Sequence, residues 1–166
     1  MRTLEPRVRL EASFESEWPG ADRLSTECVL NLWVTGNRLG AVSEEAVRAA
    51  GFPSLAAFNV LTVLEGAAEP LPPSVIAERV FVTRGAITGV MRSLETRRLI
   101  RVDGDEADRR RRLVRLTPGT ARRVRRYLAR VHASERRLFD GMPVDERRRF
   151  LRSLAWVQGS IEQLTI

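Results

Sequence analysis

A run of arginine, threonine and glycine residues in the middle of the chain has the composition of a surface that contacts DNA. In TRGAITGVMRSLETRRL (83–99), apolar residues recur at i, i+3, i+4 and i+7, so one face of a short helix is apolar: Ile87, Val90, Met91 and Leu94. The opposite face is polar and carries Arg84, Gly85, Thr88, Gly89 and Arg92. Thr83 is placed to cap the first turn of this helix. The pattern also suits an ordinary surface helix, so the flanking sequence has to decide between the two interpretations.

A second group of arginines follows this helix. Two short β-like runs, 99–102 and 113–116, flank the polar loop GDEADRRRR, which predicts a β-hairpin. Its tip carries Asp108, Arg109, Arg110, Arg111 and Arg112. An arginine run by itself is typical of a solvated loop. Here, however, it directly follows a helix that could enter a DNA groove (the candidate recognition helix). In that position it predicts a wing, a β-hairpin whose arginines contact phosphates or the minor groove of DNA.

Two shorter helices are predicted to hold the candidate recognition helix in place. Pro72-Pro73 opens a helix at 74–80, and Phe81-Val82 form the turn that leads into the recognition helix. This layout is that of a helix-turn-helix. Ser54 caps an earlier helix, 55–65, which is apolar on nearly every side and therefore belongs at the centre of the domain.

Long amphipathic helices are predicted at both ends of the chain. One covers 21–50, with Gly51 as its C-terminal cap, and two others cover 118–139 and 145–164. Their apolar stripes are longer than one small DNA-binding module can cover, which favours pairing with a second subunit. Residues 1–20 are interpreted as an arm that is loose or ordered only against a partner subunit.

Charge and composition restrict the classes of function. The net charge is +7 and the pI is near 11.2, which favours a polyanionic partner, and all 28 basic residues are arginine. Arg84 to Arg126 hold 14 arginines against five acids. One cysteine and one histidine, Cys28 and His132, predict no disulfide, no cysteine-based metal site, no catalytic dyad and no cofactor. We expect a cytoplasmic protein without a membrane span that is not an enzyme.

Residues 55–120 resemble the MarR family of transcriptional regulators. Ile76–Val80 is similar to the scaffold helix of that family, and Val82–Thr88 with Leu94-Glu95 to its recognition helix. Asp108-Arg109-Arg110 and Leu116-Thr117 resemble the Asp-x-Arg and closing Leu-Thr of its wing. The sequence departs from the family at Pro72, where a Ser or Thr cap is frequent, and at Arg92, where an Asp is frequent.

The resemblance implies a mode of action. The recognition helix would read the major groove, an arginine of the wing would enter the minor groove, and Asp108 would hold that arginine in position. The DNA-contacting residues would be Ser74, Thr83, Arg84, Gly85, Ala86, Thr88, Gly89, Arg92, Arg98, Asp108, Arg109, Arg110, Arg111 and Arg112. A pocket for a small aromatic or phenolic effector would be lined by Trp33, Asn37, Phe58 and Arg101. The alternative interpretation of Trp33 is that it is a core residue and does not line a pocket.

The sequence thus predicts a mainly helical protein with a small β wing, a winged helix-turn-helix with N- and C-terminal dimerisation helices. The arm is 1–20, the dimerisation region is 21–53 with 118–166, and the DNA-binding domain is 54–117. The predicted function is that of a homodimeric repressor, bound to a palindromic operator and released by the effector. Two alternatives stay open: a repressor that senses peroxide through Cys28, and an architectural protein that coats DNA without an operator. A lone cysteine on an apolar face is usually a buried hydrophobe, which weakens the first of these.

Overall fold

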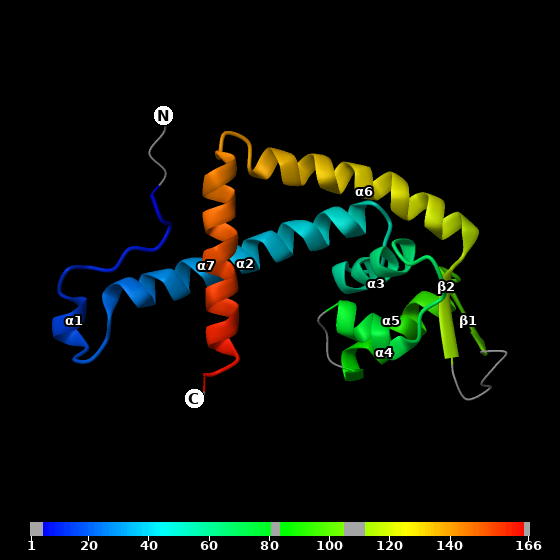
Figure 1. Ribbon diagram of the computed structural model, residues 1–166, viewed down its shortest axis with the longest axis horizontal. Helices are drawn as coiled ribbons and strands as arrows, with labels where there is room; N and C mark the ends of the chain where they lie inside the picture. Colours follow the sequence, from blue (N-terminus) through cyan, green and yellow to red (C-terminus); the bar gives the residue numbers. More distant parts are fainter. Residues whose placement is uncertain (1–4, 81–83, 105–111, 165–166) are drawn as a thin grey trace. The chain divides into compact units, whose positions relative to one another are not determined.

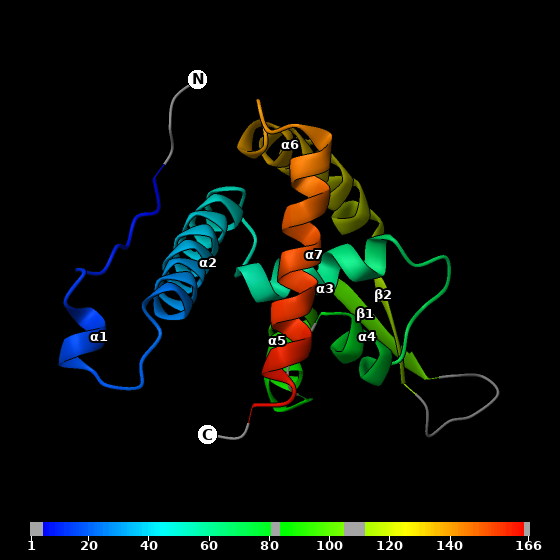
Figure 2. The ribbon, with the colours of Figure 1, turned by 60° about the vertical axis from the view of Figure 1, so that its left-hand side comes forward.

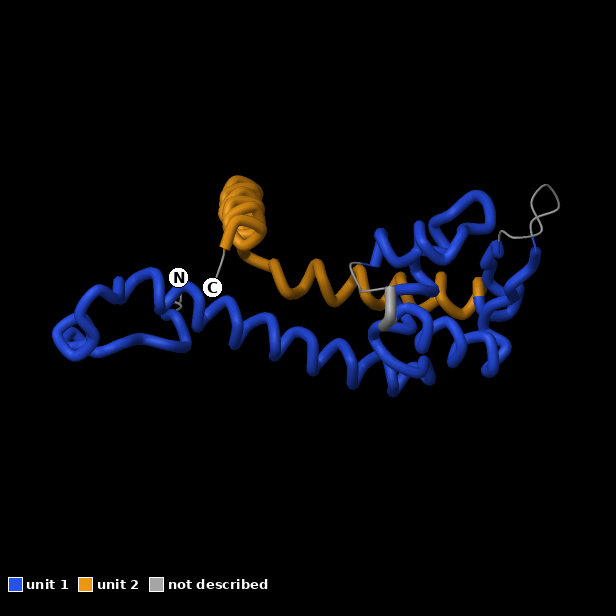
Figure 3. The backbone as a smooth tube through the Cα atoms, turned by 90° about the horizontal axis from the view of Figure 1, so that it is seen from below, with its two compact units in different colours: residues 1–120 blue, residues 121–166 orange. Residues whose placement is uncertain are grey.

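The computed structural model describes residues 5–80, 84–104 and 112–164, and for 84–86 it describes the backbone alone. These residues form the helices and the two-stranded sheet shown in Figure 1. In chain order they are α1 (Phe14–Glu17), α2 (Arg23–Ala49), α3 (Leu55–Glu65), α4 (Pro73–Arg79), α5 (Arg84–Thr96), β1 (Ile100–Gly104), β2 (Arg112–Leu116), α6 (Pro118–Leu138) and α7 (Val144–Ile161). The chain divides into two compact units, residues 1–120 and 121–166, which Figure 3 colours separately.

Both ends of α2 are defined by local hydrogen bonds. At its start, Asp22 Oδ2 accepts from the Ser25 N–H at 2.7 Å, and hydrogen bonding from the Ser25 side chain, followed by that from its N–H, lowers the pKa of the Asp22 carboxyl. At its end, Gly51 has φ +81°, and the Phe52 N–H donates to the Val47 carbonyl at 3.1 Å. A left-handed residue with such a bond ends a helix, and glycine adopts that conformation without a steric penalty. The predicted cap at Gly51 is therefore confirmed.

The described part of the N-terminal arm, residues 5–20, which includes the short helix α1, is hydrogen-bonded to its own chain. The Val8 N–H donates to Asn31 Oδ1 at 3.0 Å, and Asn31 Nδ2 donates back to the Val8 carbonyl at 2.8 Å. The Leu10 N–H donates to Glu27 Oε1 at 2.9 Å. The expectation of an arm that is loose or dependent on a partner is wrong for this segment, because polar residues of α2 pair with the backbone of residues 8–10.

Helix α3 forms the centre of the first unit. Val60 and Leu61 are 1% and 0% exposed, and Ala57, Phe58 and Leu64 are also buried. Residues of α2, α4, α5 and β2 contact α3. Burying each large apolar side chain stabilises the fold by about 2 kcal/mol, so α3 organises the unit, as its all-round apolar sequence predicts.

The helix-turn-helix and the hairpin pack on α3. Helix α4 follows Pro72, which supplies no side-chain cap, as expected from its missing donor and acceptor groups. The hairpin strands are antiparallel, with Ile100 opposite Leu116 and Val102 opposite Val114, and they lie side by side in Figures 1 and 2. Leu71 adds a bridge that the sequence did not reveal: it exchanges two backbone hydrogen bonds with Val114, at 2.9 and 3.0 Å.

Large apolar side chains remain exposed on the long helices. Helix α7, which the structure describes in full, contains no buried residue, and its Leu151 and Ile161 are 63% and 56% exposed. On α2, Trp33 is 65% exposed, and Cys28 is also exposed. The expectations that Trp33 is a core residue and that Cys28 is buried are therefore wrong for the single chain, because both side chains are exposed.

We predict that replacing Arg98 by glycine stabilises the protein. Arg98 has φ +56°, in the left-handed region, where it ends α5 with hydrogen bonds from the Arg98 N–H to the Glu95 carbonyl and from the Leu99 N–H to the Leu94 carbonyl. A non-glycine residue in this conformation costs roughly 1–2 kcal/mol, of which glycine recovers a part. Urea denaturation of Arg98→Gly should show a free energy of unfolding about 1 kcal/mol higher.

The matched control is Arg97→Gly, one residue earlier, where φ is negative and glycine brings no relief. This variant should be equal to or less stable than wild type. Equal stability gains in the two variants would contradict the explanation.

Candidate nucleic-acid interface

Helix α5 has one buried face and one exposed face, as its sequence predicts. Ile87, Met91 and Leu94 are 4%, 9% and 0% exposed. Thr88, Gly89 and Arg92 lie on the exposed side, and a Cβ added at Gly89 would meet nothing within 4 Å. The glycine is therefore not required by packing within the chain. Because glycine has no side chain, the backbone of α5 is accessible beside Arg92, and another molecule can approach it closely.

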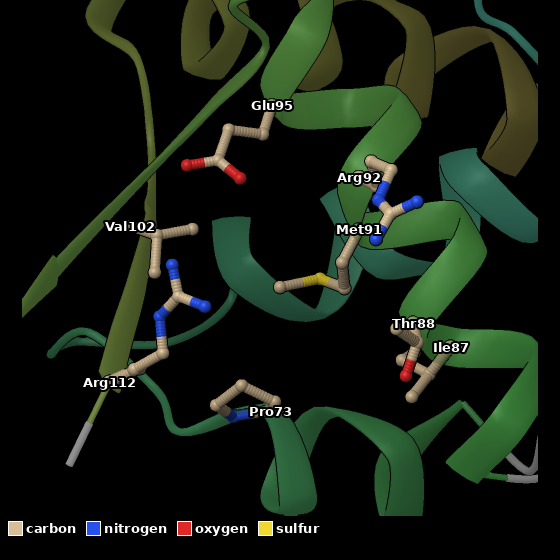
Figure 4. Close-up of a pocket in the computed structure, with 8 residues that line it drawn as sticks. All are labelled: Pro73, Ile87, Thr88, Met91, Arg92, Glu95, Val102 and Arg112. Atoms are coloured by element: carbon tan, nitrogen blue, oxygen red, sulfur yellow. The ribbon is translucent and has the colours of Figure 1, made fainter. Parts of the chain in front are cut away.

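A cavity of about 290 Å³ lies between α5, the start of α4 and the hairpin. It is lined by Pro73, Ile87, Thr88, Met91, Arg92, Glu95, Val102 and Arg112. Figure 4 shows Met91 and Glu95 extending from α5 toward the hairpin, with Arg112 extending from β2 toward α5. A shallower hollow on the outer side of α5 is lined by Gly89, Arg92, Ser93, Thr96 and Arg97. Arg92 lines both hollows and therefore lies between them.

The outer face of the hairpin carries a carboxylate between two arginines. Arg101 and Arg115 are opposite each other in the register, which places two like charges on the same face. Asp103 separates them: its Oδ1 accepts from Arg101 Nε at 2.8 Å, and its Oδ2 accepts from Arg115 Nε at 2.8 Å and pairs with Arg115 Nη2 at 2.6 Å. Desolvation raises the pKa of Asp103, but the hydrogen bonds and charges of Arg115 and Arg101 outweigh it and lower that pKa overall.

The structure places part of the predicted DNA-contacting set. The exposed members are Ser74 at the start of α4, Thr88, Gly89 and Arg92 on α5, Arg98 after it, and Arg112 at the start of β2. Arg84, Gly85 and Ala86 form the first turn of α5. Thr83, Asp108, Arg109, Arg110 and Arg111 lie outside the described residues, so the predicted cap and the predicted role of Asp108 stay untested.

The four residues predicted to line an effector pocket lie on three elements, α2, α3 and β1. Phe58 is 4% exposed and packs against Phe52, with ring centroids 5.0 Å apart. Trp33 and Asn37 are exposed on α2, and Arg101 is held by Asp103 on the hairpin. Neither of the two cavities described above includes any of the four.

Sequence reasoning missed Asp103, Arg115 and Leu71. Strand alternation places Arg101, Asp103 and Arg115 on one face, so the pairing register would have revealed the first two. Leu71 lies in a proline-rich linker that carries no strand pattern, and its bridge to Val114 had no local signal.

Comparisons with known proteins agree with this geometry. The model of the MarR family matches residues 51–111. A MarR-family transcriptional regulator from Silicibacter pomeroyi is 25% identical, with 83% of this chain and 92% of that chain covered and a TM-score of 0.62. CouR from Rhodococcus jostii RHA1, solved bound to p-coumaroyl-CoA, is 27% identical, with 81% and 96% covered and a TM-score of 0.66.

The fold is also similar to that of MepR from S. aureus, which was solved in complex with DNA. That chain is 18% identical, with 78% of this chain and 94% of MepR covered and a TM-score of 0.72. A comparison with curated protein sequences gave no match.

A buried helix, a helix-turn-helix and a β wing define the fold as a winged helix-turn-helix. Within it, residues 51–111 match the model of the MarR family, and the chain is similar along most of its length to solved MarR-family transcriptional regulators. Regulation of transcription, as printed for these similar proteins, is the coarse part of the function predicted from the sequence. No helix among the described residues is long and apolar enough to cross a membrane.

We predict that the contribution of Asp103 to stability disappears in acid. Its pKa is lower in the folded protein than the usual 3.8, so ionised Asp103 stabilises the hairpin above about that pH. As the pH falls through the folded pKa, protonation removes this stabilisation. Asp103→Asn should therefore unfold at lower urea concentration than wild type at pH 7, and the difference should shrink below pH 3.8.

The second variant in this test is Arg115→Ala, which removes one of the two cations that lower the pKa. In a protein that already carries Arg115→Ala, Asp103→Asn should lower the stability to urea at pH 7 by less than it does in the wild-type protein. A difference between wild type and Asp103→Asn that is unchanged from pH 7 to pH 2.5 would contradict the assigned role.

Proposed function

We propose that the protein is a cytoplasmic homodimeric repressor that reads a palindromic operator with α5 and the wing. The observation that carries this proposal is the division of α5 into a buried face and an exposed face of Thr88, Gly89 and Arg92 beside an arginine-bearing hairpin. Base-edge contacts specify a sequence, whereas phosphate contacts only position the protein. A discrete helix of this kind favours sequence-specific binding over architectural coating of DNA.

The two arginines that border the cavity have different expected tasks. Arg92 projects from the middle of α5, where the side chains of a recognition helix reach base edges in the major groove. Arg112 lies at the start of β2, next to the hairpin tip, where phosphate or minor-groove contact is expected. In this proposal the cavity lies between two DNA-contacting regions, one at Arg92 on α5 and one at Arg112 on β2.

The exposed apolar residues of α2 and α7 support the homodimer. Leu24, Val29, Trp33 and Val42 on α2 are each more than half exposed, and so are Leu151, Trp156 and Ile161 on α7. Apolar surface on this scale marks an interaction site, and a second copy of the chain places two recognition helices on successive major grooves. The dimerisation region would then comprise 21–53 and 118–166.

We further propose that a small aromatic or phenolic effector releases the DNA. CouR, a similar structure, binds p-coumaroyl-CoA, which contains a phenol ring. In this chain, Trp33, Asn37, Phe58 and Arg101 are the proposed lining residues, and a pocket among them would require the second subunit or a shift of α2. An effector lowers operator affinity a hundredfold if it binds the DNA-incompetent arrangement more tightly by ~2.7 kcal/mol.

We predict that arginine variants separate sequence reading from phosphate contact. Arg92→Ala should weaken operator binding roughly tenfold and reduce the preference for operator over random DNA. Arg112→Ala should weaken binding to both DNAs equally and lower the salt slope by about one unit. Fluorescence anisotropy at several salt concentrations measures both effects, and Arg38→Ala on α2 controls for the loss of one exposed charge. Wild-type binding by both variants would refute this assignment of the surface.

We predict that α7 is needed for dimerisation. Leu151 and Ile161 are exposed in the single chain, so Leu151→Glu with Ile161→Glu should leave its fold intact while burying two charges in the dimer. Sedimentation should show a monomer, whereas Arg152→Glu should remain a dimer. Deleting residues 145–166 should likewise give a monomer or an aggregate, and an intact soluble dimer after that deletion would exclude the proposal.

We predict that salicylate-like compounds release the operator and that organic peroxide does not. The rival is the Cys28 sensor, for which exposure of the thiol is the supporting observation. Operator binding should be measured with each compound, on wild type and on Cys28→Ser. Release by peroxide that disappears in Cys28→Ser, with aromatic compounds inactive, would reverse this assignment.

A further inference from the structure

The side chain of Glu44 connects the long helix α2 to the first residue of α3. Its Oε2 accepts from the Leu55 N–H at 2.6 Å, and its Oε1 accepts from Arg48 Nε at 2.5 Å. The Glu44 side chain is 34% exposed, whereas that of Arg48 is 64% exposed. The carboxylate is therefore partly enclosed between the two helices.

The bond to Leu55 satisfies a group that α3 cannot satisfy by itself. The first N–H groups of a helix have no partner within it, and here Ser54 Oγ accepts from the Ala57 N–H at 3.1 Å. Glu44, a residue of α2, accepts from the N–H of Leu55, the first residue of α3, across the turn that joins the two helices. The hydrogen bond from Leu55, followed by that from Arg48, lowers the pKa of Glu44, so the carboxylate is ionised and attracted to the positive end of α3.

The corner is also held by apolar packing and by backbone hydrogen bonds within the turn, among them the one from the Phe52 N–H to the Val47 carbonyl. Val47 and Phe52 are both 3% exposed, and Phe52 packs on Phe58. Apolar packing is not directional, so it holds the two helices together without strongly fixing their angle. A charge-assisted hydrogen bond depends on both distance and direction. Glu44 therefore supplies a directional contact from the side of α2 to the first residue of α3.

The orientation of α3 determines the orientation of the winged unit. Helix α3 contacts α4, α5 and β2, and its Leu61 is fully buried. Since close-packed interiors move as a body, a rotation of α2 against α3 changes the position of α5 relative to the whole length of α2. At ~1.5 Å per residue, α2 is about 40 Å long, so a small angle at the corner becomes a large displacement.

We infer that Glu44 is a positioning residue for operator recognition, which fixes the angle between α2 and α3 and thereby the spacing of the two recognition helices. This inference rests on the proposed function, because it concerns two subunits on one operator. Glu44 does not contact DNA in this account. Its loss would leave the binding of each half-site intact and widen the range of spacings that the dimer accepts.

The test compares Glu44→Ala with two neighbouring variants. Glu45→Ala removes the same charge from the next, exposed residue, and Arg48→Ala removes the cation but leaves the bond to Leu55. Glu44→Gln keeps an acceptor oxygen and should rescue part of the effect. The probes are the operator selected from random DNA, the same operator with its spacer changed by one base pair, and a single half-site.

Changing the spacer by one base pair rotates one half-site by ~34° about the DNA axis. We expect this change to weaken wild-type, Glu45→Ala and Arg48→Ala binding about tenfold and Glu44→Ala binding less than threefold, with equal half-site affinities. An unchanged spacing penalty in Glu44→Ala would overturn the inference. Equal loss on all DNAs, half-site included, would also overturn it, because that result indicates a general loss of fold.

A second measurement does not depend on DNA and separates this inference from the proposed function. Spin labels at Thr35→Cys on α2 and Thr96→Cys on α5, in a Cys28→Ser background diluted with unlabelled chains, report the distance within one chain. Glu44→Ala should broaden the distance distribution, and Glu45→Ala should not. A wild-type protein without sequence preference would contradict the proposed function, while an unbroadened Glu44→Ala distribution would contradict the role of Glu44.

Discussion

The need to cover the apolar surface of α3 determines the arrangement of the winged unit. Its sequence LAAFNVLTVLE is apolar at most positions, so water must be excluded from most of its surface, although Asn59 remains exposed. The end of α2, helices α4 and α5, and strand β2 supply that cover, and each is amphipathic or alternating for this reason. The exposed face of α5 is therefore a consequence of packing: once Ile87, Met91 and Leu94 face α3 and its neighbours, Arg92 has to face outward.

Electrostatics divides the arginines of the winged unit into two groups. Arg101 and Arg115 are neutralised in part by Asp103, which allows two cations to lie opposite each other on a two-stranded sheet. Arg92 and Arg112 line the cavity beside α5 and the hairpin. The arginines that line the cavity are thus distinct from the pair held by Asp103, which stabilises the two strands of the hairpin.

The sequence was sufficient for local structure and insufficient for long-range pairing. Ser54 acts at a helix end through its side-chain oxygen, and Gly51 and Pro73 act through their backbone conformation, so these boundaries could be predicted from local sequence. The arm against α2, the Leu71 bridge and the Glu44 bond to Leu55 join residues that are 11 to 43 positions apart, and no periodic pattern encodes them. The exposure of Trp33 and Cys28 could not be predicted either, because an apolar stripe does not say which chain covers it.

The central claim is that α5 reads a specific DNA sequence as part of a two-fold dimer, and selection from random DNA tests it most directly. The account predicts enrichment of one palindrome whose half-sites are ~10 base pairs apart, centre to centre, bound far more tightly than random DNA at physiological salt. Unenriched pools, with binding that depends on salt concentration but not on sequence, would contradict it.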